Sequence, residues 1–302
     1  MLTCDEYLTP ASLDEAFAAM AKNRGRYRVV AGATDTLPWA REGRAGDVDI
    51  PVLIDVSKIP ELHELSVSDK RARIGAATPI QRFLDNPQLA RALPEMPRCA
   101  VWFADDQIRA QATIGGNIVN ASPAADGTPC LIAHEAKVEI ASASGKRAMP
   151  LKDFITGPNK TALKEGELVT GFDCDALPGY GGSFEKVGHR RSLVISLVCL
   201  AVLVKLDPEG RRVEDVRLSI AGIAALPQRL TDVEKFLRGN ALTAGRLEQA
   251  AEMPVDLVAS RTRQAYRRDV VRGFMLRGLI NAARRAGADP DALSSELEAA
   301  YV

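Results

Sequence analysis

Several common features are missing from this sequence of 302 residues. It contains no run of about 18 apolar residues, the length that a transmembrane helix needs. Lys and Arg number 39, as do Asp and Glu, so the positive excess typical of non-specific nucleic-acid or anionic-membrane binders is absent. The first residues lack the basic and apolar regions of a signal peptide. We therefore expect a cytoplasmic protein without a nucleic-acid partner or a membrane span.

Metal-ligating side chains are also sparse. The three histidines include no pair at i, i+4 spacing, and the cysteines include no C-x-x-C pair that could hold zinc or an iron–sulfur cluster. We therefore expect no metal site in this chain, and we expect any redox cofactor to be organic. The cysteines should be reduced, buried thiols. The cysteines are Cys4, Cys99, Cys130, Cys174 and Cys199.

The composition, 46% hydrophobic and 26% charged, is that of an ordinary globular protein, and the length favours about two domains. The glycine-rich segment 176–183 is the best boundary, which gives units at 1–176 and 183–302. The first unit begins with β-α-β character, and its helix from Leu13 has Ser12 as cap and Glu15 at the capping-box position. The second unit has strands at 183–187, within 193–204 and at 213–220, then helices near 229–238, 243–252 and 260–286.

Two short turns have the composition of anion-binding turns. One is residues 31–35, after a predicted strand, and the other is residues 113–117, inside the segment 107–129. That segment is too rich in turn residues for a regular element and too apolar for disorder, so we predict a buried functional loop. Glycine lacks a Cβ, so successive N–H groups can converge on an anion. Neither turn is a P-loop or a Rossmann fingerprint, and a plain turn explains either one taken alone.

The sequence around both turns is specific. Residues 31–35 read A-G-A-T-D, and residues 107–126 read Q-I-R-A-Q-A-T-I-G-G-N-I-V-N-A-S-P-A-A-D. These segments resemble motifs of the FAD-binding (medium) subunits of molybdenum hydroxylases. This xanthine dehydrogenase family includes the flavoproteins of carbon monoxide dehydrogenase and 4-hydroxybenzoyl-CoA reductase. Segments 74–78, 157–161, 184–187 and 266–268 extend the resemblance over the chain. Ala33 departs from the family pattern, since it replaces the second glycine of A-G-G-T-D.

The resemblance implies an α+β fold. A two-lobed FAD-binding domain of the vanillyl-alcohol oxidase/PCMH type would precede a small α/β domain with a three-stranded sheet and helices. It further implies that the backbone of both turns clasps the FAD diphosphate and that Asp126 accepts hydrogen bonds from sugar hydroxyls on the adenosine side. Leu168 and Lys186 would contact the isoalloxazine. The implied cofactor-binding residues are Val30, Ala31, Gly32, Ala33, Thr34, Asp35, Thr36, Phe103, Thr113, Ile114, Gly115, Gly116, Asn117, Asp126, Leu168 and Lys186.

Plainer interpretations stay open for several of these residues. Asp126 can be an Asx-turn cap, Phe103 an aromatic packed in a core, and Lys186 a solvated charge on a strand. The arginines of the last helix alternate with apolar residues at helical spacing, which favours a solvated face or a partner-subunit surface over a nucleic-acid site.

The resemblance implies an oxidoreductase subunit without catalytic residues of its own. FAD would pass electrons from iron–sulfur clusters to NAD+ or another acceptor. The molybdopterin would reside on a large partner subunit and two [2Fe–2S] clusters on a small one, in a dimer of heterotrimers. The complex would oxidise a purine, an N-heterocycle, an aldehyde or an aromatic compound. Two rival functions are a free-standing flavin oxidase and a nucleotide-binding scaffold without a redox role.

Overall fold

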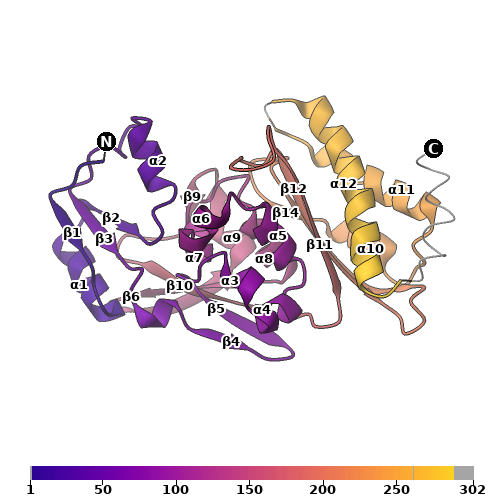
Figure 1. The fold of residues 1–302 in the computed structure, drawn as a ribbon, viewed down its shortest axis with the longest axis horizontal. Coiled ribbons are helices and arrows are strands. Elements are labelled where there is room, and N and C mark those ends of the chain that lie inside the picture. The colour runs from indigo at the N-terminus through magenta and orange to yellow at the C-terminus, as the bar shows by residue number, and fades with distance from the viewer. Residues whose placement is uncertain (1, 261, 289–302) are drawn as a thin grey trace.

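The structure is a computed structural model that describes residues 2–260 and 262–288. An N-terminal lobe, a central lobe and a C-terminal sheet with its helices follow one another along the long axis of the molecule (Figure 1). The predicted units 1–176 and 183–302 also include Met1, Arg261 and residues 289–302, which lie outside the described residues.

The N-terminal lobe is a parallel sheet of order β1-β3-β2 packed against α1. The predicted cap of α1 is confirmed. Ser12 Oγ accepts a hydrogen bond from the N–H of Glu15 at 3.2 Å, and the Glu15 carboxylate accepts one from the N–H of Ala11 at 2.8 Å. The elements of this lobe are β1 (Glu6–Leu8), α1 (Leu13–Lys22), β2 (Tyr27–Val30), α2 (Thr36–Arg41), β3 (Val52–Asp55) and a 3-10 turn (Pro60–Leu62).

The central lobe is an antiparallel sheet of order β4-β5-β10-β6-β7 with short helices around it. Its strands are β4 (Leu65–Val67), β5 (Arg71–Gly75), β6 (Lys137–Ser142), β7 (Gly145–Pro150), β8 (Ile155–Gly157), β9 (Lys160–Thr161) and β10 (Leu168–Asp175). Its helices are α3 (Arg82–Asp85), α4 (Pro87–Ala92), α5 (Met96–Trp102), α6 (Asp106–Gln111), α7 (Ile114–Val119), α8 (Gly127–Ala133) and α9 (Leu151–Phe154).

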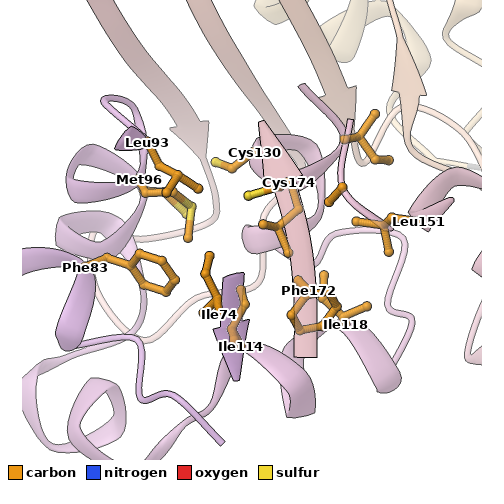
Figure 2. Close-up of a cluster of buried hydrophobic side chains, with 14 of the residues drawn as sticks. Ile74, Phe83, Leu93, Met96, Ile114, Ile118, Cys130, Leu151, Phe172 and Cys174 are labelled. Carbon is orange, nitrogen blue, oxygen red and sulfur yellow. The ribbon is translucent and has the colours of Figure 1, made fainter. Parts of the chain in front are cut away.

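The main core of this lobe fills the space between the helices and the sheet (Figure 2). Phe83 of α3 faces Ile74 of β5, while Phe172 comes from β10. Ile114 and Ile118 of α7 are fully buried in the same cluster, and their spacing of four residues puts both on one face of the helix. The core therefore fixes the helix that follows Thr113.

The segment 107–129 differs from the predicted loop, because most of α6, all of α7 and the start of α8 fall inside it. Two side chains cap these helices. Asp105 Oδ1 accepts a hydrogen bond from the N–H of Ile108 at 2.8 Å, and Thr113 Oγ1 accepts one from the N–H of Gly116 at 3.0 Å. Capping and burial of the isoleucines outweigh the low helix propensity of glycine, which is why the composition pointed the wrong way.

The C-terminal part is an antiparallel sheet of order β11-β12-β13-β14. The three predicted strands and three predicted helices are present, and the structure adds a fourth strand of two residues, β14. The elements are β11 (Gly181–Val187), β12 (Val198–Leu206), β13 (Val213–Ala221), β14 (Gln228–Arg229), α10 (Thr231–Leu237), α11 (Ala244–Glu252), a 3-10 turn (Val255–Leu257) and α12 (Gln264–Arg285).

Strand β12 explains the long apolar run in the sequence, because both faces of its sheet are covered. Val198, Leu200 and Val202 pack toward α12, whereas Cys199 and Ala201 belong to the core of the central lobe. The C-terminal sheet is thus held between α12 on one side and α5 and α8 on the other (Figure 1).

Several arginines of α12 have partners within their own domain, but the Arg277 side chain is 55% exposed and Arg284 is exposed, so the solvated or partner-facing surface stays a prediction. Arg267 is buried, Arg272 pairs with Glu252, Arg277 pairs with Glu185, and Arg285 donates to the carbonyl of Gly182. These side chains mainly fasten α12 to its own domain. Within residues 2–260 and 262–288, no helix is both long and apolar enough to cross a bilayer.

Candidate cofactor site

The turn between β2 and α2 presents a row of free backbone donors. In the described part of the chain, the N–H groups of residues 32–36 have no hydrogen-bond acceptor. Ala33 lies in the left-handed region, with φ of 52°, directly after Gly32, whose φ is not positive. Successive N–H groups in such an alternating conformation converge and form a concave anion site. This turn has the donor geometry that a diphosphate needs.

The first turn lies directly against the chain that leads into α7. A Cβ on Gly32 would overlap the carbonyl oxygen of Gln111, so only glycine permits this approach. A second link joins Asp35, whose carboxylate accepts a hydrogen bond from Asn120 Nδ2 at 2.8 Å. Burial raises the pKa of Asp35, and the charge of Arg44 opposes that shift. The two predicted turns are therefore neighbours.

The backbone of the second turn is used inside the protein. The N–H of Ile114 donates to Thr78, that of Gly115 to Ala76, and those of Gly116 and Asn117 to the side chain and carbonyl of Thr113. In this conformation these N–H groups have acceptors inside the protein, and their contact with the FAD diphosphate stays a prediction. Two donors remain on this side, because the Thr113 hydroxyl proton has no acceptor and Asn117 Nδ2 has none among the described residues.

Gly115 and Gly116 have different surroundings. A Cβ on Gly115 would lie 2.5 Å from the carbonyl oxygen of Ala76, so this glycine is required for packing against the segment after β5. A Cβ on Gly116 would meet only Thr113 Oγ1, at 3.0 Å, and the residue is exposed. Gly116 thus leaves open the surface that a ligand would approach.

A buried polar cluster joins Asp126 to the C-terminal domain. Lys186 Nζ lies 2.5 Å from Asp126 Oδ2, and Ser196 Oγ donates to Asp126 Oδ1 at 2.6 Å. The Asp126 and Lys186 side chains are only 8% and 4% exposed. Burial raises the pKa of the Asp126 carboxyl, while Lys186 and Ser196 act in the opposite direction. Lys186 is therefore not a solvated charge, because its side chain is buried against Asp126. Asp126 is not an Asx-turn cap, because it forms no side-chain cap bond to α8.

The two hydrophobic candidates lie in different places. Phe103 ends α5 and packs against the central core, next to the carbonyl of Trp102, which accepts a hydrogen bond from Lys186 at 3.1 Å. Leu168, at the start of β10, packs with the core of the N-terminal lobe. Phe103 therefore lies near the Asp126 cluster, and Leu168 belongs to the seam between the two lobes.

Sequence reasoning missed Ser196, Asn120 and a surface cavity. Ser196 carried a signal, since it is a polar residue inside a buried apolar run.

The surface cavity has a volume of about 600 Å³ and lies between the end of α5, α6 and the segment that follows β11. It is lined by Val101, Trp102, Ala104, Asp105, Asp106, Gln107, Arg109, Arg191 and Ser192.

The thiols and acidic groups form no metal centre in the described residues, where no group of three or more His, Cys, Asp or Glu side chains could hold an ion. All five cysteines are free, and four of them are buried. Cys4 is exposed, so the prediction of buried thiols is wrong for that residue. Cys99 and Cys130 face the Asp126 carbonyl, and burial raises the pKa of both.

Residues 3–173 match the family described as the FAD binding domain in molybdopterin dehydrogenase. The chain belongs to this family. Residues 183–282 match the C-terminal domain of the carbon monoxide dehydrogenase flavoprotein, so the family resemblance drawn from the motifs is confirmed. The donors of the first turn, the open face of Gly116 and the buried Asp126 cluster fit an FAD-binding domain of this kind.

Named relatives span nearly the whole chain. The glyceraldehyde dehydrogenase medium chain of Sulfolobus acidocaldarius is 31% identical over 92% of this chain and 98% of its own length. The putative xanthine dehydrogenase FAD-binding subunit of Escherichia coli is 31% identical over 85% of this chain and 87% of its own. Carbon monoxide dehydrogenase of Hydrogenophaga pseudoflava shares the fold, with a TM-score of 0.86, 26% identity, and coverage of 94% of this chain and 99% of that one. This protein is accordingly an oxidoreductase subunit.

Proposed function

We propose that this subunit holds FAD and transfers electrons from iron–sulfur clusters of a partner to NAD+ or another acceptor. The complex would oxidise a purine, an N-heterocycle, an aldehyde or an aromatic substrate. The main support is the row of free N–H groups at residues 32–36 in a chain of the FAD-binding family. These donors lie against the segment that carries Thr113, whose hydroxyl proton is also free.

Bound FAD supplies exchange between one-electron and two-electron carriers, and the protein binds, orients and electrostatically tunes it. The turn at 32–36 would donate hydrogen bonds to the diphosphate, and Thr113 and Asn117 would donate from the neighbouring segment. Neither segment contains a lysine, so dipoles and not a net cation would stabilise the phosphate charges.

Asp126 and Lys186 would act at the polar groups of the cofactor. Each carboxylate oxygen of Asp126 has a second acceptor site, so it can accept a sugar hydroxyl while it holds Lys186 and Ser196. The Lys186 ammonium would favour negative charge on the reduced ring. Because the two side chains are in contact, they would act as one group.

The partners are part of the proposal. Relatives are named as a medium chain, a medium subunit and the alpha subunit of a dehydrogenase complex. We propose a large molybdopterin subunit and a small iron–sulfur subunit, assembled as a dimer of heterotrimers in the cytoplasm. Within the chain, we propose 1–176 as the FAD-binding domain and 183–302 as the C-terminal domain.

Absorption spectroscopy of the purified protein tests this function. We expect an oxidised-flavin spectrum that bleaches when NADH is added anaerobically, since electron transfer to NAD+ is reversible. A colourless protein that binds a nucleotide would support the scaffold function and overturn the proposal. A flavin reduced directly by an organic substrate, without partner subunits, would support the free-standing oxidase. Bleaching by partner subunits that their substrate has reduced, but not by NADH, would assign a different acceptor.

A further inference from the structure

Arg267 is a buried cation whose hydrogen-bond partners are all backbone carbonyls. It lies on α12 and is 7% exposed. Its Nη1 donates to the carbonyls of Leu197 and Gly222, the latter at 2.6 Å, and its Nε donates to that of Thr262 at 3.0 Å. Among the described residues no carboxylate pairs with it, and burial lowers its pKa. A buried charge without a counter-ion is costly, so an apolar side chain would stabilise the fold more simply.

The carbonyls bound by Arg267 belong to segments that frame the Asp126 cluster. Leu197 directly follows Ser196, which donates to Asp126, and the N–H of Leu197 donates to Val187, the neighbour of Lys186, at 2.8 Å. The N–H of Gly222 donates at 2.8 Å to Pro123, three residues before Asp126. The Arg267 guanidinium thus binds the segment of Ser196 and Leu197, which also holds the end of the Lys186 strand. Through Gly222 it is connected to the loop that carries Asp126.

Gly222 shows that these segments approach closely. Its φ is 83°, and a Cβ there would lie 2.5 Å from the Leu197 carbonyl oxygen. Two carbonyl dipoles that converge on one point repel each other, and a cation between them removes the repulsion. Two other arginines of α12 have ordinary partners, since Arg272 and Arg277 pair with carboxylates.

We infer that Arg267 is a positioning residue, by which the C-terminal helix holds Lys186 and Ser196 on Asp126 in the FAD site. This inference rests on the proposed FAD function. It gives the C-terminal domain a role in cofactor affinity and redox tuning through the backbone, without contact between α12 and the cofactor.

The test compares Arg267→Met with Arg285→Met, in the full chain. Arg285 is a matched control because it also lies on α12 and also donates to a backbone carbonyl of β11, that of Gly182, four residues from Lys186. We expect Arg267→Met to weaken FAD binding about tenfold or more and to shift the flavin absorption maximum and midpoint potential. Arg267→Lys should recover part of the FAD affinity and part of the spectral and potential shifts. Arg285→Met should change neither readout.

Each other outcome decides the question. Wild-type FAD affinity and potential in Arg267→Met would overturn the inference, as would equal losses in both methionine variants, which indicate general loosening. If Arg267→Met does not fold, Arg267→Lys and Gly222→Ala replace it, and unchanged flavin readouts in both would overturn the inference. A wild-type protein that binds no FAD would instead contradict the proposed function.

Discussion

Ala33 shows what the departure from the glycine motif means for the backbone. Its φ of 52° is a conformation that costs an L-residue about 1–2 kcal/mol, whereas glycine adopts it freely. The chain keeps this conformation although a methyl group is present, and the N–H groups of residues 32–36 have no acceptor among the described residues. The turn is therefore strained in the form that the anion site requires.

We predict that Ala33→Gly raises the free energy of unfolding by up to about 1 kcal/mol, because the relief of left-handed strain exceeds the added entropy of the unfolded chain. FAD content should stay at the wild-type level, since the backbone geometry is retained. Denaturant unfolding and the flavin-to-protein absorbance ratio measure the two effects. A destabilised variant would show that the Ala33 methyl contributes packing that outweighs the strain.

At the scale of elements, α7 gives different surroundings to two adjacent glycines that look equivalent in the sequence. Gly115 is closed in by the Ala76 backbone, whereas a Cβ on Gly116 would meet only the side chain of Thr113. The difference depends on where the segment after β5 passes, which is a tertiary contact and leaves no trace in the local sequence.

This difference makes Gly116→Ala a specific probe of the cofactor site. The methyl group would stand where the ligand approaches, so we expect FAD affinity to fall by about tenfold or more. The apo protein should keep its stability to within about 1 kcal/mol, because the better helix propensity of alanine is offset by the contact of its Cβ with Thr113 Oγ1 at 3.0 Å. Isothermal titration with FAD and circular dichroism measure both.

Gly115→Ala is the matched variant with the opposite expectation. Its Cβ would meet a backbone carbonyl at 2.5 Å, so the variant should be destabilised by about 1–3 kcal/mol even without ligand. Equal FAD affinity in Gly116→Ala and the wild type would mean that α7 has only a structural role.

The elements also show how far the sequence leads. The cap at Ser12 and the apolar strand β12 could be predicted because local hydrogen bonding and burial leave a direct pattern in the residues. Helix α7 could not, because its stability depends on Ile114 and Ile118 reaching a core built by distant strands. The ion pair of Asp126 with Lys186 joins residues 60 apart, and no local pattern marks such a contact.

At the scale of the whole molecule, ion pairs fasten the C-terminal sheet to the central lobe. Asp175, at the end of β10, accepts from Arg71 of β5 at 2.5 Å and from Arg217 of β13 at 2.8 Å. Arg229 of β14 pairs with Glu135 of the central lobe. Through Arg217 and Arg229, the sheet that contains the Lys186 strand is linked to the lobe that carries Asp126, so the two cannot shift freely relative to each other.

Asp215 on β13 lies at this junction and gives it a pH dependence. Tyr180, between the central lobe and β11, donates to Asp215 Oδ2 at 2.7 Å, and Arg238 donates to Oδ1 at 2.6 Å. Burial alone would raise the pKa of Asp215, but these hydrogen bonds and the charges of Arg238 and Arg217 outweigh it, so the pKa is lowered. A carboxyl whose pKa is lower in the folded state adds stability above its unfolded value of about 3.9, and this stability is lost as the pH falls through the folded value.

We therefore predict that Asp215→Asn lowers the free energy of unfolding at pH 7 and that its deficit relative to the wild type shrinks as the pH falls below about 4. Denaturant unfolding at pH 7 and at several values below 4 measures this difference, in which the other carboxyls cancel. Asp232→Asn is the control, because the Asp232 side chain is 83% exposed and its pair with Lys235 should contribute little at any pH. A deficit that stays constant with pH would show that Asp215 stabilises the junction by packing and hydrogen bonding alone, and that its charge carries none of the effect.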